Sequence, residues 1–177
     1  NDQIGIVNHD RHHQVYCILD FGYTTAMWFI QEVGVNAHII KYYEESGRSI
    51  EGWAQYLLDL KESDGYNYGN IIVPCDMDSN ATRIITGNSA LETLRDMGLP
   101  VQSLQKEKSV QEGISRTIKF LHSCYMDAKN CEQGLVRLES YHEKLNKAMS
   151  TEMNPVFTGS PDKDGNDHGA DGMRYVS

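Results

Sequence analysis

The stretch of the sequence between residues 15 and 43 constrains the fold most. It contains three runs that are rich in β-branched and aromatic residues and are separated by short segments around glycines. These runs are Val15–Asp20, Thr25–Gln31 and Ala37–Tyr43. Their composition predicts β-strands, and connections this short favour an antiparallel meander.

After the meander the pattern changes to helices that alternate with strands. Apolar residues at helical spacing predict a helix from Ile50 to Leu60, and the apolar run Ile71–Cys75 predicts a strand buried on both faces. The further elements that we expect are a capped helix over Ser89–Gly98, a strand over Val101–Gln105, a helix from Ser109, a longer helix over Cys131–Met149, a loop over Asn154–Asn166 and a last helix near Asp167–Tyr175. Alternation of this kind predicts an α/β domain in which helices pack on a mixed sheet of about five strands.

The 177 residues are enough for one domain with a hydrophobic core. Residues 1–14 are polar and are expected to form a linker or extension, with one domain over residues 15–177. The chain begins at Asn1, and we expect it to be part of a longer polypeptide. No apolar run approaches the ~20 residues of a membrane span, so no membrane association is expected.

The net charge of −9 argues against a protein that holds nucleic acid strongly by itself. It does not exclude a nuclease, because a site that collects cations needs carboxylates. The four cysteines show no C-x-x-C spacing, so reduced thiols are expected instead of a zinc site.

Three aspartates are distinguished by their positions. Asp20 ends the first predicted strand, Asp76 follows the strand that ends at Cys75, and Asp171 lies in the last helix. Sites on open α/β sheets usually form at the carboxyl ends of strands. If the strands of Asp20 and Asp76 are neighbours and the last helix crosses them, the three carboxylates converge.

A cluster of three carboxylates suits Mg²⁺ or Mn²⁺, which prefer hard oxygen ligands. Two ions about 4 Å apart can support phosphodiester hydrolysis. An Asp at a strand end is also a common turn former or helix cap. The spacing alone therefore predicts a globular α/β domain. It leaves two interpretations of the three aspartates, as metal ligands or as structural residues of turns and helix caps.

Several motifs resemble the nuclease domain of tailed-phage or prophage terminase large subunits, in the same order along the chain. Asp20 lies in the segment ILDFGYTTAMWF, which is followed by YYEESG; Asp76 ends VPCD, and Asp171 lies in HGADGMRY, which resembles a closing H-x-x-D-x-x-R-Y motif. The resemblance extends over nearly the whole chain from Val15.

This resemblance implies a ribonuclease H-like fold and an endonuclease that cuts concatemeric double-stranded viral DNA during genome packaging. It implies that Asp20, Asp76 and Asp171 are catalytic and hold two Mg²⁺ or Mn²⁺ ions. The implied partners are double-stranded DNA, an N-terminal ATPase domain of the same polypeptide, the portal and the small terminase subunit. The implied location is the cytoplasm of the infected bacterial host.

The sequence departs from the family pattern at a few positions. The ATPase motif G-x-x-x-x-G-K-[ST] does not occur in this chain. Tyr23 and Thr24 fill a short loop where the family often has a second aspartate. Gly172 replaces a common alanine, which should weaken the helix by ~1 kcal/mol. These departures leave the three acids in place.

Further candidates have both a functional and a structural interpretation. His168 could move a proton or orient a neighbour, Asp78 could be an outer ligand or a solvated loop residue, and Asp167 could be a ligand or a helix cap. Glu44 could approach the metals or end its strand in solvent. Arg174 could pair with Asp171 three residues earlier or with a phosphate, and the pairing with Asp171 is the one expected.

A basic face for the DNA backbone is a further possibility. The residues that would form it are Lys106, Lys108, Arg116 and Lys119. Charges on amphipathic helices are more often simply solvated. Two alternative functions also stay open: a docking module of the packaging motor with weak or regulated cleavage, and a related resolvase or integrase core.

Overall fold

The computed structural model describes residues 3–74, 89–104, 110–145, 150, 155–161 and 167–175. Within these, only the backbone is described for residues 74, 110–111, 143–145, 157–161 and 167. The elements follow in the order β1 (Ile4–Gly5), β2 (Val15–Asp20), β3 (Thr24–Val33), β4 (Asn36–Ser46), α1 (Ile50–Ser63), β5 (Tyr68–Pro74), α3 (Ala90–Asp96), β6 (Val101–Leu104), α4 (Val110–Leu121), β7 (Cys124–Asp127), α5 (Glu132–Ser140), β8 (Glu143–Leu145), β9 (Phe157–Pro161) and α6 (Asp167–Arg174).

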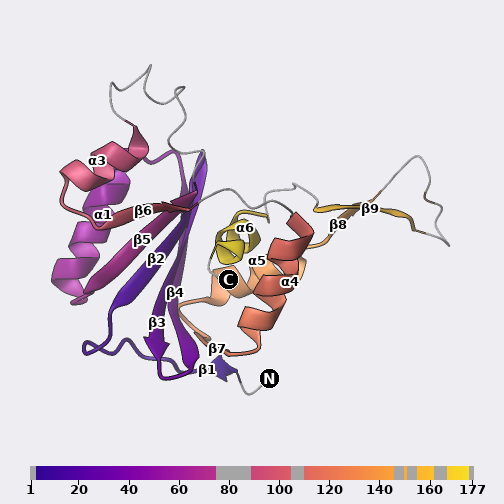
Figure 1. The fold of residues 1–177 in the computed structure, drawn as a ribbon, viewed down its shortest axis with the longest axis horizontal. Helices are drawn as coiled ribbons and strands as arrows, with labels where there is room; N and C mark the ends of the chain where they lie inside the picture. Colours follow the sequence, from indigo (N-terminus) through magenta and orange to yellow (C-terminus); the bar gives the residue numbers. More distant parts are fainter. Residues whose placement is uncertain are drawn as a thin grey trace.

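A mixed sheet with the strand order β1-β7-β4-β3-β2-β5-β6 forms the centre of the domain. Strands β2, β3 and β4 form the predicted antiparallel meander, and β5 and β6 extend it in parallel beside β2. Helices α1 and α3 cover one face of the sheet, and α4, α5 and α6 cover the other (Figure 1). The predicted α/β class with a mixed sheet is confirmed.

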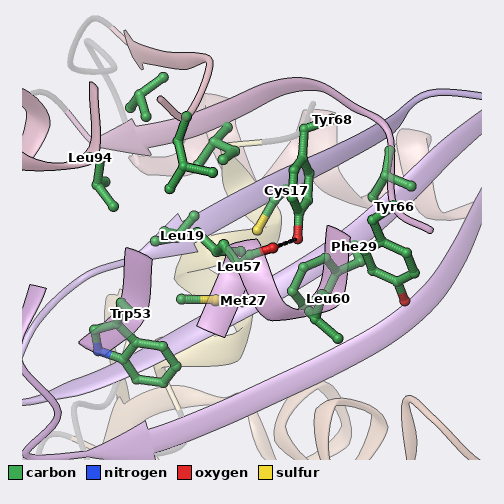
Figure 2. Close-up of a cluster of buried hydrophobic side chains, with 14 of the residues drawn as sticks. Cys17, Leu19, Met27, Phe29, Trp53, Leu57, Leu60, Tyr66, Tyr68 and Leu94 are labelled. Atoms are coloured by element: carbon green, nitrogen blue, oxygen red, sulfur yellow. Dashed lines mark hydrogen bonds between the residues drawn. The ribbon is translucent and has the colours of Figure 1, made fainter. Parts of the chain in front are cut away.

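Two hydrophobic clusters hold the helices to the sheet. Because side chains of a strand alternate between its faces, Cys17 and Leu19 of β2 point toward α1 and α3, whereas Ile18 points toward the other helices. Figure 2 shows the first cluster, in which the hydroxyl of Tyr68 donates a hydrogen bond of 3.0 Å to the carbonyl oxygen of Leu57. Trp28 lies in the second cluster and is completely buried.

The capped helix predicted between residues 89 and 98 is confirmed. Ser89 accepts a hydrogen bond from the backbone N–H of Glu92, and the Glu92 side chain accepts one from the N–H of Ser89. Gly98 ends the segment with a φ of 84°, a conformation that glycine adopts without strain. This capping box fixes where helix α3 begins.

Among the described residues the sheet has seven strands instead of about five, because β1 and β7 were not expected. The helix expected over Cys131–Met149 ends at Ser140, since Tyr141 has an extended backbone with a ψ of 121°. Strand β8 follows and pairs with β9, which lies within the segment that we expected to be a loop. This small hairpin extends away from the helices (Figure 1).

Residues 3–14, which we expected to be a linker or extension, contact the sheet at several points. Strand β1 pairs in parallel with β7, and Val7 belongs to the hydrophobic cluster between the sheet and α1. The Gln31 side chain accepts a hydrogen bond of 2.8 Å from the N–H of Asp10 and donates to two carbonyl oxygens in this segment.

Three cysteines among the described residues, Cys17, Cys124 and Cys131, are buried free thiols. Burial raises the pKa of Cys124 and of Cys131 to about 12. In the part of the chain that the structure describes, no helix is both long and apolar enough to cross a membrane.

Candidate metal centre

The sheet edge at which β2 and β5 end is the predicted location of the site. These strands are parallel neighbours, with Ile18 opposite Ile72, so their carboxyl ends lie at the same edge. Asp20 is the last residue of β2, and β5 ends at Pro74. Asp76 and Asp78 lie outside the described residues, and their positions stay predictions.

Helix α6 packs across β2 and β3 at this edge (Figure 1). The indole N–H of Trp28 donates a 2.8 Å hydrogen bond to the carbonyl oxygen of Gly169. A Cβ placed on Gly172 would lie 3.7 Å from the Cβ of Asp20. The helix that carries Asp171 therefore packs against the end of β2.

His168 contacts the first acid of the site. Its Nδ1 lies 3.0 Å from Oδ2 of Asp20, and the Asp20 side chain is only 15% exposed. This contact supports the interpretation in which the imidazole orients a neighbour. It leaves open whether His168 also moves a proton. Asp167 is the first residue of α6, and its role as a cap or ligand stays a prediction.

Asp171 pairs with Arg174, as expected from their spacing. The Arg174 Nη2 donates to Oδ1 of Asp171 at 2.6 Å, and both side chains are largely buried. A largely buried carboxylate needs a counter-charge, because burial without one is costly. The guanidinium of Arg174 supplies it here.

Glu44 lies in the same row of the sheet as Asp20. Ala26 of β3 is opposite Asp20 on one side and opposite Glu44 on the other, so the two acids share a face, about 10 Å apart at the usual strand spacing. The expectation of a solvated strand end for Glu44 is wrong, because its side chain is only 6% exposed. Its possible approach to the metals stays a prediction.

The carboxylate of Glu44 is held by partners from two elements. Arg137 of α5 donates from Nε to both carboxylate oxygens at 3.1 and 3.2 Å and forms an ion pair through Nη2. Gln133 donates to Oε1 at 2.6 Å, and the Tyr42 hydroxyl donates to Oε2. Burial raises the pKa of Glu44, but the hydrogen bonds from Arg137 and Tyr42 outweigh it and keep this pKa below its ordinary value.

Two glycines that were not predicted hold α5 and α6 close to their neighbours. A Cβ on Gly134 would lie 2.4 Å from Cη2 of Trp28, and a Cβ on Gly169 would lie 2.9 Å from Cβ of Arg137. These glycines therefore allow close helix packing. No local signal identifies them, because the contacting residues lie far away in the sequence.

The basic residues considered for DNA contact are only partly described. Lys106 and Lys108 lie outside the described residues. Arg116 and Lys119 are both exposed on α4. Contact of any of them with DNA stays a prediction.

Among the described residues, which do not include Asp76, no group of three His, Cys, Asp or Glu side chains could hold a metal ion. The donors that are described nevertheless fit a hard divalent cation. Asp20 and Asp171 would supply carboxylate oxygens from a strand end and a helix that are in contact, and oxygen is the ligand that Mg²⁺ and Mn²⁺ prefer. A third acid at Asp76 would complete such a site.

The sheet order and the helices on both faces define a ribonuclease H-like fold. The chain has, more particularly, the fold of phage large terminase nuclease domains. The large terminase of a thermophilic bacteriophage superposes with a TM-score of 0.71 at 16% identity, over 99% of this chain and 42% of that one. The nuclease domain of the P22 large terminase gives 0.66 at 17% identity, over 97% and 83% of the two chains.

A third structure was solved with metal. The nuclease domain of g2p, the large terminase of bacteriophage SPP1, has bound Mn and gives a TM-score of 0.64 at 16% identity, over 98% of this chain and 93% of that one. The sequence matches no protein-family model and no curated protein. The chain spans less than half the length of the thermophilic phage terminase.

Proposed function

We propose that this chain is the nuclease domain of a phage or prophage terminase large subunit and acts as a divalent-metal-dependent DNA endonuclease. One observation carries the proposal. Asp20 and the Asp171 helix are in contact at the carboxyl edge of the sheet, in a fold that matches terminase nuclease domains over nearly the whole chain. The Mn bound to the SPP1 domain supports the choice of metal.

The residues of the site would have two roles, to bind the metal ions and to orient the carboxylates that bind them. Asp20, Asp76 and Asp171 would hold two Mg²⁺ or Mn²⁺ ions, which when bound would activate a water and stabilise the departing oxygen. His168 would keep the Asp20 carboxylate in one orientation, and Arg174 would do the same for Asp171. Fixed ligands matter because a displacement of even 1 Å costs rate in such reactions.

The substrate and partners follow from the same proposal. The substrate would be concatemeric double-stranded viral DNA, cut during packaging in the host cytoplasm. An ATPase domain of the same polypeptide, the portal and the small subunit would complete the machine. The 42% coverage of the thermophilic phage terminase agrees with a chain that is one part of a longer motor protein.

Incubation of this chain with supercoiled plasmid and Mn²⁺ tests the activity directly. We expect nicking that a chelator stops and that Asp20→Asn, Asp76→Asn and Asp171→Asn each abolish while circular dichroism shows a folded domain. Wild-type rates in one of these variants would remove that residue from the site. If the wild-type chain does not cut at all, the docking-module alternative, which the charge of −9 favours, replaces the enzyme.

A further inference from the structure

The turn between β2 and β3, which follows Asp20 directly in the sequence, carries an exposed aromatic ring. Tyr23 is 83% exposed, although it lies only three residues after Asp20. The N–H of Gly47 donates a 2.8 Å hydrogen bond to the carbonyl oxygen of Tyr23. The ring atom Cε2 and the hydroxyl oxygen lie 3.9 Å from where a Cβ on Gly47 would be. The backbone of Tyr23 is thus fixed against Gly47, and its ring lies near Gly47 and is open to solvent.

Two hydroxyls near this turn, those of Thr24 and Ser46, lie on the same face of the sheet as Asp20. Thr24 is opposite Ser46, and Ala26, two residues further along β3, is opposite Asp20. The alternation of strand side chains places Thr24 on the face of Asp20, about 7 Å further along the strand. The hydroxyl oxygens of Thr24 and Ser46 are 2.7 Å apart in an exposed position.

The chemistry of this pair suits an anionic acceptor. Each hydroxyl carries one donor hydrogen, and the bond between the two uses only one of them. One hydrogen remains for an acceptor outside the pair, such as a phosphate oxygen. Hydroxyl side chains are common donors to DNA phosphates, and they fix the register of the duplex without reading its sequence.

We propose that Tyr23, Thr24 and Ser46 form a contact surface, here called the rim, for the sugar–phosphate backbone of the DNA strand that enters the metal centre. This inference rests on the proposed function and deepens it. The hydroxyl pair donates to a phosphate about one nucleotide away from the phosphate that is cut. The Tyr23 ring packs against the sugar next to that phosphate. An acidic chain gains from such contacts, because they do not require a basic patch.

The neutral character of the rim gives a specific test. A fluorescein-labelled 30-base-pair duplex is titrated with this chain in Ca²⁺, which stands in for the reactive metal, at several salt concentrations. We expect the double variant Thr24→Val/Ser46→Ala to bind about tenfold more weakly. The slope of affinity against salt should not change, because neutral donors release no counterions. Ser63→Ala, at the end of α1, is the matched control and should bind like the wild type.

Tyr23 has its own readout. Both native tryptophans, Trp28 and Trp53, are buried, so Tyr23→Trp introduces an exposed indole. Acrylamide should quench the fluorescence of this indole, and bound DNA should reduce the quenching. Tyr23→Ala should weaken duplex binding about fivefold. Val35→Ala, at the opposite end of the β3–β4 hairpin and 93% exposed, should have no effect.

Two results separate the rim from the proposed function. If the wild-type chain cuts plasmid and the rim variants bind the duplex with wild-type affinity, the rim is overturned and the nuclease stands. If the wild-type chain neither cuts nor binds the duplex, both are overturned. A changed salt slope in the double variant would also contradict a neutral contact.

Discussion

His168 and Arg174 lie on either side of Asp171 in α6, and each contacts a carboxylate of the candidate site. The side chains in these two contacts are at most about one-third exposed, so both contacts lie largely within the packed structure. A ligand that a second residue orients loses less freedom when a metal binds. At the scale of the residue, these partners are therefore as important to test as the acids themselves.

The role of His168 can be separated into orientation and proton transfer. His168→Ala should slow plasmid nicking in Mn²⁺ by about 10- to 100-fold, the usual effect of losing a residue that orients a ligand. His168→Asn offers an amide N–H near the position of Nδ1 and should recover most of the rate. If the asparagine variant is as slow as the alanine variant, orientation of Asp20 is not the main role.

Gly134 should not tolerate even a methyl group. A Cβ there would lie 2.4 Å from Cη2 of Trp28 and 2.7 Å from Cγ of Tyr42, and both rings are buried. Overpacking of up to ~3 kcal/mol should exceed the ~1 kcal/mol gained in helix propensity. Gly134→Ala should therefore destabilise the domain by about 2 kcal/mol, seen as a Tm lower by roughly 4–8 °C.

The matched control is Gly5→Ala, where a Cβ would have nothing within 4 Å. Its Tm should stay within about 2 °C of the wild type, as is usual for a surface substitution. A stable Gly134→Ala domain would mean that α5 can move away from the sheet.

At the scale of the element, the sequence predicted those strands and helices whose signals are local. The meander β2–β3–β4, the helix α1 and the capping box of α3 have their determinants within a few residues. Strand β7 was missed because its four residues become a strand by pairing with β4 and β1, which are far away in the sequence. Apolar spacing near three and four continues past Ser140 into Leu145, so periodicity alone extended α5 too far.

The candidate site shows the same limit. Asp20 and Asp171 could be predicted, because a strand end and a motif mark them. The partner of Glu44 could not, because Arg137 is 93 residues away in the sequence. Which carboxylate pairs with an arginine of another element depends on tertiary packing. No local sequence pattern encodes this pairing.

The ion pair between β4 and α5 should make stability depend on pH. The pKa of Glu44 is lowered in the folded domain, so its contribution is fully present above its ordinary value near 4.5 and is lost as the pH falls through the folded pKa. Glu44→Gln should reduce the free energy of unfolding by about 2 kcal/mol at pH 7. The difference from the wild type should shrink below about pH 4.5.

Urea denaturation of both proteins at a series of pH values measures this difference. Glu62→Gln, on the exposed side of α1, is the control and should differ little from the wild type at any pH. A gap between wild type and Glu44→Gln that stays constant into the acid range would show that the charge of Glu44 is not what the pair contributes.

At the scale of the whole molecule, a charge of −9 must be reconciled with a polyanionic substrate. Metal ions bound at the proposed site would lower the repulsion, and the neutral donors of the proposed rim would bind phosphate without a basic patch. A longer polypeptide, of which the thermophilic phage terminase gives an example, could supply further contacts to DNA. We therefore expect this chain alone to bind duplex DNA weakly and to depend strongly on divalent cations.

Metal binding should consequently be visible as a gain in stability of the whole domain, without any DNA. A cation that binds only the folded chain stabilises it by mass action, by about 2.7 kcal/mol at a concentration 100 times its Kd. Thermal unfolding in Mn²⁺ should then show a Tm higher by roughly 5–10 °C than in chelator. Asp20→Asn and Asp171→Asn should each remove most of this shift, because each deletes a charged ligand. Asp59→Asn, an exposed acid on α1 across the sheet, should retain it. If all four proteins shift equally, the ion binds elsewhere, and the carboxylates at the end of β2 and on α6 hold the fold together without holding a metal.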